Sequence, residues 1–404
     1  MNSLREHETL VVVHRVPVTV TPLHEWLAEV ADRVVLITST ESADAYRAVF
    51  DHVIAVDDYS DGPAVARHLD ELCRAHRVAR IVCGTEDDAL RVAAARERWG
   101  IPGMGLREAL LHRDKLLMKD AVGRRVRTPG YTAPESPEEA VEFAERTGWP
   151  VVVKPRSGYG SRGVRVVHDA ESLWKEVADR AEEDLLLEEF VPGVVYHVDG
   201  FTHQGEVLWS VPSRYLNTCL SWQEGASLGS AQMDPGDDLT LRLDAFAREV
   251  SKALPIAEPT PFHLEVFEHS VTGELLFCET AARTGGGHIL DVLEHATGMN
   301  CVREWYRGQC GLPQACDRPR TTSERFGFLL VPPRRGRLLS IADDHPEYAR
   351  IASRSTPPQE FGAAAASTDT VMGVIVSGTS NQRVEERLAS CAAWAERAME
   401  WETV

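Results

Sequence analysis

Two short runs of β-branched residues enclose a glycine-rich segment, and this feature constrains the fold more than any other in the chain. Residues 151–153 read VVV, residues 164–167 read VRVV, and PRSGYGSRG lies between them after Lys154. Such runs with a glycine-rich connection predict a β-hairpin with a long loop. One interpretation is a surface hairpin with a solvated tip. The other is a flap over phosphates, because glycines let backbone N–H groups approach an anion and Lys154 adds a charge at the loop's root.

Residues 1–108 alternate short apolar runs with helical patterns. This alternation predicts a parallel sheet, because parallel strands need crossover connections that are usually helical. The stretch GIPGMG, residues 100–105, marks the end of this Rossmann-like α/β domain. The expected strands are Leu10–Val13, Val34–Thr38, Val53–Val56 and Arg80–Cys83, and the expected helices are Pro22–Ala31, Ala43–Phe50, Val65–His76 and Glu86–Trp99.

Three further units are expected beyond this domain. Residues 109–192 place the hairpin among helical patterns and predict a small α+β lobe. Residues 193–310 return to strands and predict a large lobe, whereas residues 311–404 pattern weakly until the amphipathic helix 382–402 and are expected to form a C-terminal α+β subdomain. The helical patterns of the small lobe are Arg107–Val122, Pro137–Thr147 and Ser172–Glu183, and the strands of the large lobe are Val194–Phe201, Glu206–Ser213, Phe262–His269 and Leu275–Thr280.

Charge and composition narrow the function classes. The formal net charge is −19, which argues against a nucleic-acid-binding surface and against adhesion to an acidic membrane. No apolar run approaches the roughly 20 residues that span a bilayer, and the N-terminal residues do not resemble a secretory signal. A cytoplasmic location is therefore expected. The eight cysteines lack metal-binding spacing and are expected to be reduced thiols.

Glu265 and Glu279 lie on two predicted strands joined by the turn VTGE, residues 271–274. Gly273 suits this turn because it can adopt a positive φ. Antiparallel pairing brings the two carboxylates to neighbouring positions, where like charges destabilise a sheet unless a cation lies between them. Mg²⁺ prefers oxygen ligands and takes phosphate oxygens readily. The pattern predicts a metal site, and the alternative is two like charges on a solvated face.

Arg283 follows Glu279 by four residues and precedes three glycines, residues 285–287. A cation beside a metal–phosphate site stabilises developing negative charge. Glycines that lead into the helical pattern His288–Ala296 offer N–H groups to an anionic substrate. The alternatives are a surface salt bridge for the arginine and a flexible turn for the glycines.

The segment LLLEEFVPG, residues 185–193, is an apolar strand that ends in two carboxylates. One interpretation is a strand end with solvated glutamates. The other is a hinge between lobes that binds a purine. Glu188 then accepts a hydrogen bond from the exocyclic amine, and the backbone of Phe190 or Val191 contacts the edge of the ring.

In their order along the chain, these segments resemble the ATP-grasp carboxylate–amine ligases, and within them the group that includes amino-acid (dipeptide) ligases. The resemblance covers about residues 10–310. It implies an α/β ATP-grasp architecture with an N-terminal parallel-sheet domain, a small α+β lobe over ATP and a C-terminal antiparallel-sheet lobe. The stretches that carry it are RDKLLMK (113–119), VVVKPRSGYGSRGV (151–164), LLLEEFVPG (185–193), LEVF (264–267) and FCETAARTGGGHI (277–289).

The resemblance also implies roles for individual residues. Lys115 and Lys154 contact the nucleotide phosphates. Glu265 and Glu279 hold Mg²⁺, for which Mn²⁺ is a substitute, and Arg283 acts in catalysis together with Lys154. The further nucleotide contacts that it implies are Ser157, Gly158, Gly160, Ser161 and Gly163 in the flap and Glu188, Glu189, Phe190 and Val191 at the hinge.

Two positions depart from the family pattern. Relatives often hold the ribose with a glutamate just past the hinge, and here the stretch GVVYHVDG places Val195 there. Ribose contacts then come from His197, Asp199 or the backbone. Relatives also often have an asparagine two residues after the second metal carboxylate. Here that residue is Ala281, so a second ion would lack this ligand.

The implied reaction joins an acid to an amine. The substrate carboxylate attacks the γ-phosphate of ATP to give an acylphosphate and ADP, and the amine then displaces phosphate. Arg283 and the backbone at Gly286 and Gly287 are expected to contact substrate during these steps. Arg214, Tyr215 and Trp222 are expected to line the acceptor pocket, with Arg214 holding a carboxylate, although a structural loop with a buried tryptophan is the alternative.

The expected partners are a small carboxylic acid and an amine, both amino acids in the leading interpretation. Family members are often dimers, so a homodimer is a further expectation. The alternatives are an ATP-grasp carboxylase, a ligase of nucleotide precursors, a kinase that stops at the phosphorylated acid, and an ATP-binding regulator without turnover.

Overall fold

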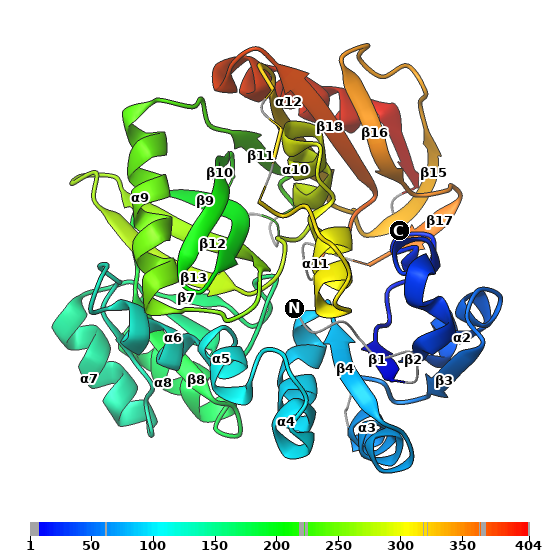
Figure 1. The fold of residues 1–404 in the computed structure, drawn as a ribbon. Helices are drawn as coiled ribbons and strands as arrows, with labels where there is room; N and C mark the ends of the chain where they lie inside the picture. Colours follow the sequence, from blue (N-terminus) through cyan, green and yellow to red (C-terminus); the bar gives the residue numbers. More distant parts are fainter. Residues whose placement is uncertain are drawn as a thin grey trace.

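The computed structural model describes residues 8–60, 63–217, 222, 225–317, 319–320, 322–362, 364 and 369–402. These residues form four β-sheets flanked by helices (Figure 1). The free thiols in this part of the chain are Cys73, Cys83, Cys278, Cys301, Cys310, Cys316 and Cys391, as expected, whereas Cys219 lies outside it. None of the helices described is both long and apolar enough to cross a bilayer.

The N-terminal domain is the predicted parallel sheet, with strand order β3-β2-β1-β4. Separate apolar clusters cover its two faces, which is typical of a parallel sheet between helices. The strands are β1 (Thr9–Val13), β2 (Val34–Ser39), β3 (His52–Val56) and β4 (Val78–Cys83), and the helices are α1 (Leu23–Trp26), α2 (Thr40–Arg47), α3 (Pro63–Ala75) and α4 (Ala89–Trp99), with 3₁₀ turns η1 (Ala28–Arg33) and η2 (Glu86–Asp88).

The predicted helix Arg107–Val122 is two helices, α5 (Leu106–Leu111) and α6 (Lys115–Val122). Asp114 separates them because it adopts an extended conformation and its carboxylate accepts the N–H groups of Leu116 and Leu117. This is an N-cap, which aspartate fills well. The cap places Lys115 at the first position of α6.

The small lobe contains the predicted hairpin. Strand β6 (Val151–Pro155) pairs antiparallel with β7 (Arg165–Val167), which confirms that the glycine-rich segment is its loop. The strand order is β5-β8-β6-β7. Helices α7 and α8 pack their apolar side chains against these strands. The remaining elements of the lobe are β5 (Tyr131–Thr132), β8 (Leu185–Glu189), α7 (Pro137–Thr147) and α8 (Ala170–Asp179).

An eight-stranded antiparallel sheet forms the large lobe, in the order β13-β12-β9-β10-β11-β14-β18-β16. Its strands are β9 (Gly193–His203), β10 (Glu206–Tyr215), β11 (Leu228–Gln232), β12 (Thr260–His269), β13 (Leu275–Ala281), β14 (Arg325–Val331), β16 (Ala349–Arg354) and β18 (Met372–Gly378). Its helices are α9 (Asp238–Ala253), α10 (Ile289–Thr297), α11 (Cys301–Gln309) and α12 (Asn381–Ala398). A small sheet of β15 (Gly336–Ile341), β17 (Gln359–Phe361) and β19 (Met399–Glu402) lies beside it.

The expected boundary at residue 310 is wrong at the level of the sheet. Strand β14 pairs with β11, and β18 and β16 continue the same sheet. Residues beyond 311 therefore complete the large lobe instead of forming a separate subdomain. The amphipathic helix predicted at 382–402 is α12, which ends at Ala398.

Helix α11 joins the large lobe to the N-terminal domain (Figure 1). Tyr306 on α11 is fully buried, and its hydroxyl lies 2.7 Å from Nδ1 of His14 at the end of β1. Gly84, just after β4, leaves room for this ring, because a Cβ there would lie 2.4 Å from the hydroxyl. The contact holds the loop after β4, and with it η2, close to β13.

Candidate active site

A large cleft lies between the hairpin of the small lobe and strands β12 and β13 of the large sheet. It encloses about 1050 Å³, its open mouth included. The flap, the hinge and both predicted metal ligands line it. The predicted site residues on its wall are Lys115, Lys154, Gly158, Ser161, Glu188, Glu189, Phe190, Val191, Glu265 and Glu279.

The flap takes a conformation that suits glycine. Gly160 and Gly163 have φ of 64° and 70°, in the left-handed region. Between them Ser161 has φ of 58°, which is uncommon for a residue with a side chain. At the flap's tip the hydroxyl of Tyr159 donates to Asp87 of the N-terminal domain at 3.1 Å. The flap therefore spans the cleft and touches the opposite domain.

Glu188 lies between two buried lysines. Its carboxylate is 2.8 Å from Nζ of Lys119 on α6 and 2.8 Å from Nζ of Lys154 on β6. Burial raises the pKa of Glu188, but the two ammonium groups outweigh burial and hold that pKa below its ordinary value. Both carboxylate oxygens of Glu188 therefore pair with lysines, and the hydrogen bond that Glu188 is expected to accept from an adenine amine stays a prediction.

The hinge itself keeps its expected place. Glu189 accepts the N–H of Gly130 at 3.1 Å, which ties β8 to the linker before β5. Phe190 and Val191 line the cleft beyond it, with Val195 and Phe267. The hinge end of the cleft is therefore mainly apolar, as the face of a purine requires.

Glu265 and Glu279 are directly opposite each other in the β12–β13 ladder, as the VTGE turn predicted. Glu279 lies 3.2 Å from Nζ of Lys115, which also donates to the carbonyl of Gly158 in the flap at 2.7 Å. Burial works to raise the pKa of Glu279, but Lys115 and Lys154 lower it to about 2. Two ionised oxygen donors at the wall of a cleft, with lysines beside them, fit a Mg²⁺ ion that carries phosphate.

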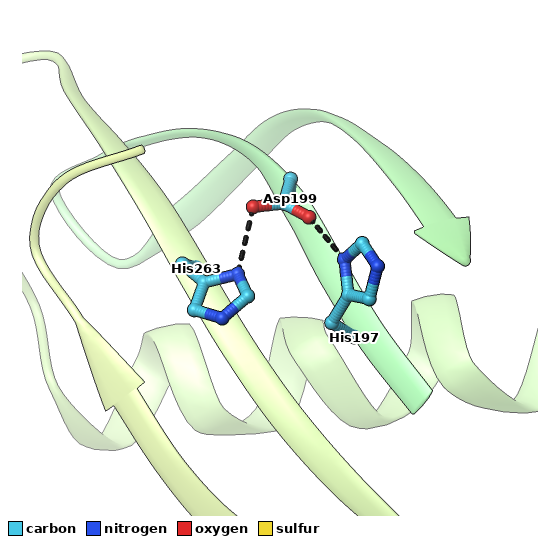
Figure 2. Close-up of side chains that lie close together, drawn as sticks. All are labelled: His197, Asp199 and His263. Atoms are coloured by element: carbon cyan, nitrogen blue, oxygen red, sulfur yellow. Dashed lines mark hydrogen bonds and ion pairs between the residues drawn. The ribbon is translucent and has the colours of Figure 1, made fainter. Parts of the chain in front are cut away.

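Figure 2 shows a buried triad of His197, Asp199 and His263 on strands β9 and β12. Asp199 on β9 accepts from Nδ1 of His197 at 2.5 Å and from Nδ1 of His263 at 2.8 Å. Nε2 of His263 lies 3.5 Å from Glu265, and Nε2 of His197 is 2.6 Å from the hydroxyl of Ser230. Burial works to lower the pKa of His263, but Asp199 and Glu265 raise it to about 10. This chain of hydrogen bonds fixes Glu265 from behind.

The triad also revises one expected contact and explains one glycine. His197 is buried on the sheet and is not on the wall of the cleft, so the structure does not bring it to the ribose position. Gly285 packs on the triad, because a Cβ there would lie 2.8 Å from Nδ1 of His263 and 3.0 Å from Asp199. A larger residue would push residues 285–287 away from Glu265 and Glu279.

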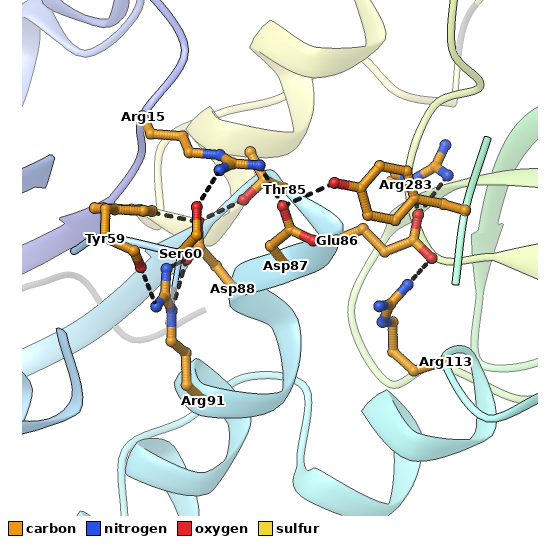
Figure 3. Close-up of polar contacts among 11 residues, drawn as sticks. Arg15, Tyr59, Ser60, Thr85, Glu86, Asp87, Asp88, Arg91, Arg113 and Arg283 are labelled. Carbon is orange, nitrogen blue, oxygen red and sulfur yellow. Dashed lines mark hydrogen bonds and ion pairs between the residues drawn. The ribbon is translucent and has the colours of Figure 1, made fainter. Parts of the chain in front are cut away.

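Arg283 is half-buried and forms an ion pair across the domain boundary (Figure 3). Its guanidinium contacts the carboxylate of Glu86 on η2, and so does the guanidinium of Arg113. Sequence reasoning did not assign a role to Glu86, since no spacing links it to Arg283, 197 residues away. The only available signal was the run of three carboxylates, Glu86, Asp87 and Asp88, directly after β4.

The three carboxylates of η2 have different partners (Figure 3). Glu86 binds the two arginines, and Asp87 contacts Arg15 and the flap. Asp88 is fully buried and accepts from Tyr59 at 3.0 Å and from Arg91. Asp88 therefore anchors η2, whereas Glu86 and Asp87 contact the large lobe and the flap through Arg283 and Tyr159.

The structure does not bring together the residues predicted for an acceptor pocket. Arg214 forms an ion pair with Glu385 on α12 at 3.3 Å, and strand alternation turns it away from the face that carries His197 and Tyr215. Trp222 is 1% exposed and packs in the core with α10 and α11. Tyr215 shares the face of the triad, with its ring 4.5 Å from that of His197.

The three glycines of residues 285–287, here called the glycine loop, lie just before α10. Gly286 is exposed with no atom within 4 Å of the place where a Cβ would be. Gly287 has φ of 61°, which glycine adopts without strain. The loop therefore leaves backbone open to a ligand, next to Arg283.

Comparisons with known proteins agree with this geometry. Residues 114–194 match the family described as carbamoyl-phosphate synthase L chain, ATP binding domain. The match runs from the cap of α6 through the flap to the start of β9. It thus includes Lys115, Lys154 and the hinge.

Two curated relatives match long stretches of the chain. The chain is 28% identical over 269 residues to the L-arginine-specific L-amino acid ligase of Bacillus subtilis, which covers 64% of each chain. It is 28% identical over 209 residues to dapdiamide A synthase of Enterobacter agglomerans, which covers 48% of this chain and 46% of the relative. The chain therefore spans less than two thirds of the length of these relatives.

A solved structure shares the whole fold. The crystal structure of an L-amino acid ligase from Bacillus licheniformis superposes with a TM-score of 0.76, over 99% of this chain and 100% of that one. The sequence identity is 15%, so the likeness is one of architecture.

Proposed function

This chain belongs to the ATP-grasp ligase family, and from that premise we propose that it is an ATP-dependent, ADP-forming ligase that joins a carboxylate to an amine. The proposal follows the relatives that form amide bonds. We further propose that an amino acid supplies at least one of the two groups. The cofactors are ATP and Mg²⁺, with Mn²⁺ as a substitute.

One observation carries the proposal. The opposed carboxylates of Glu265 and Glu279 lie at the same end of the cleft as Lys115, with Arg283 in the adjoining hollow. Phosphoryl transfer needs positioning and charge neutralisation more than covalent help from the protein. A purine at the apolar hinge would direct its phosphates toward this cluster of charges.

Several residues of the chain act in the first step, in which ATP phosphorylates the carboxylate. Bound Mg²⁺ would supply positive charge at the phosphates. Lys115 and Lys154 bind the phosphate oxygens, and Lys154 is kept charged by Glu188. Arg283 binds the carboxylate that attacks the γ-phosphate, and it neutralises the charge that develops there.

The second step needs a dry site. An acylphosphate reacts with water, so the flap must exclude solvent until the amine arrives. The contact from Tyr159 to Asp87 holds the flap against the N-terminal domain. Arg283 and the N–H groups of Gly286 and Gly287 then stabilise the tetrahedral oxyanion as phosphate leaves.

The test is phosphate release from MgATP with amino acids offered singly and in pairs, followed by mass spectrometry. We expect release that depends on one pair and a product whose mass is the sum of the two minus water. Release that needs bicarbonate would instead indicate a carboxylase. Nucleotide binding without any release would indicate a regulator.

A further inference from the structure

A chamber behind Arg283 lies between the N-terminal domain and the large lobe. The centre of a sphere the size of a water molecule can occupy about 40 Å³ of it, so the chamber is narrow. The end of β4, η2 and α4 form one wall, and α5, the end of β13 and α11 form the others. Its apolar lining residues are Cys83, Ala89, Met104, Ala109, Ala282 and Trp305.

The chamber is connected to the nucleotide cleft. A smaller hollow, here called the junction, shares Glu86 and Arg283 with the chamber. The junction also shares Lys115, Gly158 and Glu279 with the cleft. Cleft, junction and chamber therefore follow one another. A molecule whose carboxylate lies at the junction can extend the rest of its atoms into the chamber.

The junction favours a carboxylate. Glu86 is one negative charge between the guanidinium groups of Arg113 and Arg283, so one positive charge is in excess. Nε of Arg113 is buried and has no hydrogen-bond partner within the described residues. A buried donor without a partner costs free energy, which a bound anion would recover.

Away from the junction, the chamber favours an uncharged group, because the other two charged side chains of its wall, Arg96 and Glu258, are already bound within the described part of the chain. Arg96 donates to the carbonyl of Ile81 and to Gln309. Glu258 pairs with Arg80 at 3.2 Å. A charged ligand group would have to be buried there without a partner, and that is costly.

The neutral polar groups of the wall are satisfied as well. Gln309 donates to the carbonyl of Cys83 at 2.9 Å, and Thr260 donates to the carbonyl of Glu258 at 2.9 Å. His112 donates to the carbonyl of Glu108, and burial lowers the pKa of its ring. The wall therefore offers apolar contact and leaves few hydrogen bonds to be made.

We propose that this chamber binds the side chain of the acid that the enzyme activates, and that this acid is an amino acid with an uncharged, mainly apolar side chain. The inference rests on the proposed ligase function, which supplies the carboxylate at the junction. It adds the chemical class of the acid. The alanines at 89, 109 and 282 set the room available.

Hydroxylamine trapping identifies the acid without knowledge of the natural amine. ATP phosphorylates the carboxylate and leaves as ADP, and hydroxylamine then displaces phosphate to give a hydroxamate. We would compare glycine, alanine, valine, leucine and methionine with aspartate, glutamate, lysine and arginine. We expect hydroxamates from the uncharged acids, at a kcat/KM about tenfold or more above that of any charged acid.

Two variants test the wall directly. Ala89→Leu narrows the chamber and should lower the leucine-to-alanine ratio of kcat/KM about tenfold or more. Ala89→Asp adds an unpaired carboxylate and should raise the lysine-to-norleucine ratio about tenfold. The matched control is Ala94→Leu, an exposed alanine on the same helix, which should leave both ratios within about twofold.

The outcomes separate the two proposals. Hydroxamates formed best from charged acids would overturn the chamber proposal and leave the ligase function intact. The same holds if Ala89→Leu and Ala94→Leu behave alike. If no amino acid gives a hydroxamate and no pair gives an amide, the ligase function fails and the chamber proposal fails with it. The comparison of acids in the wild-type protein decides the matter even if a variant does not fold.

Discussion

Glu265 on β12 lies directly opposite Glu279 on β13. Both carboxylates line the cleft. Lys115 contacts Glu279, and His263 contacts Glu265. Like charges that face each other across a ladder repel, so this pair makes sense as a cation site.

Glu279→Gln should abolish the response to metal ions because it removes one charged oxygen donor. We expect kcat to fall about 10²–10³-fold, comparable to the loss of one electrostatic contact at a reacting group. Mn²⁺ binding, followed by electron paramagnetic resonance in the presence of ADP, should weaken in parallel. Glu274→Gln, in the turn of the same hairpin, is the control and should bind Mn²⁺ like the wild type. Unchanged Mn²⁺ affinity in Glu279→Gln would remove the metal assignment.

Arg283→Lys tests whether the reaction needs only the positive charge at this position or also the planar guanidinium group. Lysine keeps the positive charge but lacks the planar fork that binds a carboxylate in two places. We expect kcat to fall about 10²-fold while the KM for ATP changes less than about threefold, since in the proposed reaction Arg283 acts on the acid and not on the nucleotide. The exposed Arg127→Lys serves as control. A rise in the KM for ATP with kcat intact would place Arg283 on the nucleotide instead.

Glu188→Gln should destabilise the protein by about 3–5 kcal/mol at pH 7, because Lys119 and Lys154 would be left buried without a counter-ion. The pH dependence has a definite sign. The pKa of Glu188 is below its ordinary 4.5 in the fold, so its stabilisation is complete above that value and is lost as the pH falls through the folded pKa.

Urea unfolding of wild type and Glu188→Gln at pH 7, 5 and 4 measures this effect. The difference in unfolding free energy between the two proteins should shrink as the pH falls. The neighbouring exposed Glu189→Gln should differ from wild type by only about 0.5 kcal/mol at every pH. A difference that stays constant with pH would show that the ionised form of Glu188 does not stabilise the fold.

Tyr159→Phe should let water enter the site beneath the flap. The change removes one hydrogen bond to Asp87, which is worth about 0.5–1.5 kcal/mol, so the closed flap should be about 2–10-fold less favoured. ATP hydrolysis per amide formed should rise accordingly, as water reaches the acylphosphate. Tyr131→Phe is the matched control, because Tyr131 also donates to an aspartate, Asp120, but lies outside the cleft. If the two variants hydrolyse equal amounts of ATP per amide formed, the hydrogen bond between Tyr159 and Asp87 does not hold the flap closed.

The local parts of the site could be predicted from sequence. Turn chemistry predicts the glycine-rich loop between β6 and β7 and the hairpin at VTGE. The period of two along a strand then predicts that Glu265 and Glu279 lie opposite each other. These features involve residues that are close in sequence. The parallel sheet followed from the same kind of local pattern.

The contacts between distant segments could not be predicted in this way. Lys119 on α6 meets Glu188 on β8 only in the folded chain, where α6 packs against β13, and no pattern in either segment indicates the other. Glu86 reaches Arg283 only because α11 holds the N-terminal domain in place. Strand alternation shows that Arg214 and Tyr215 point to opposite faces, but it does not say which face belongs to the site.

The same limit explains the wrong boundary at residue 310. Strand β14 joins β11 across about a hundred residues, and antiparallel pairing at such a distance leaves no local signal. Helix α9 was also not predicted, although Leu243, Ala247 and Val250 lie on one buried face at helical spacing. This helix therefore does have a local signal in the sequence, between the strand patterns on either side.

The most direct test of the account follows oxygen. Once the acid and the amine are known, the acid is supplied with ¹⁸O in its carboxylate, and the released phosphate is analysed by mass. An acylphosphate intermediate predicts that one labelled oxygen moves from the acid to phosphate for each amide formed, with ADP as the nucleotide product. Unlabelled phosphate, or AMP and pyrophosphate in place of ADP and phosphate, would contradict the proposed reaction.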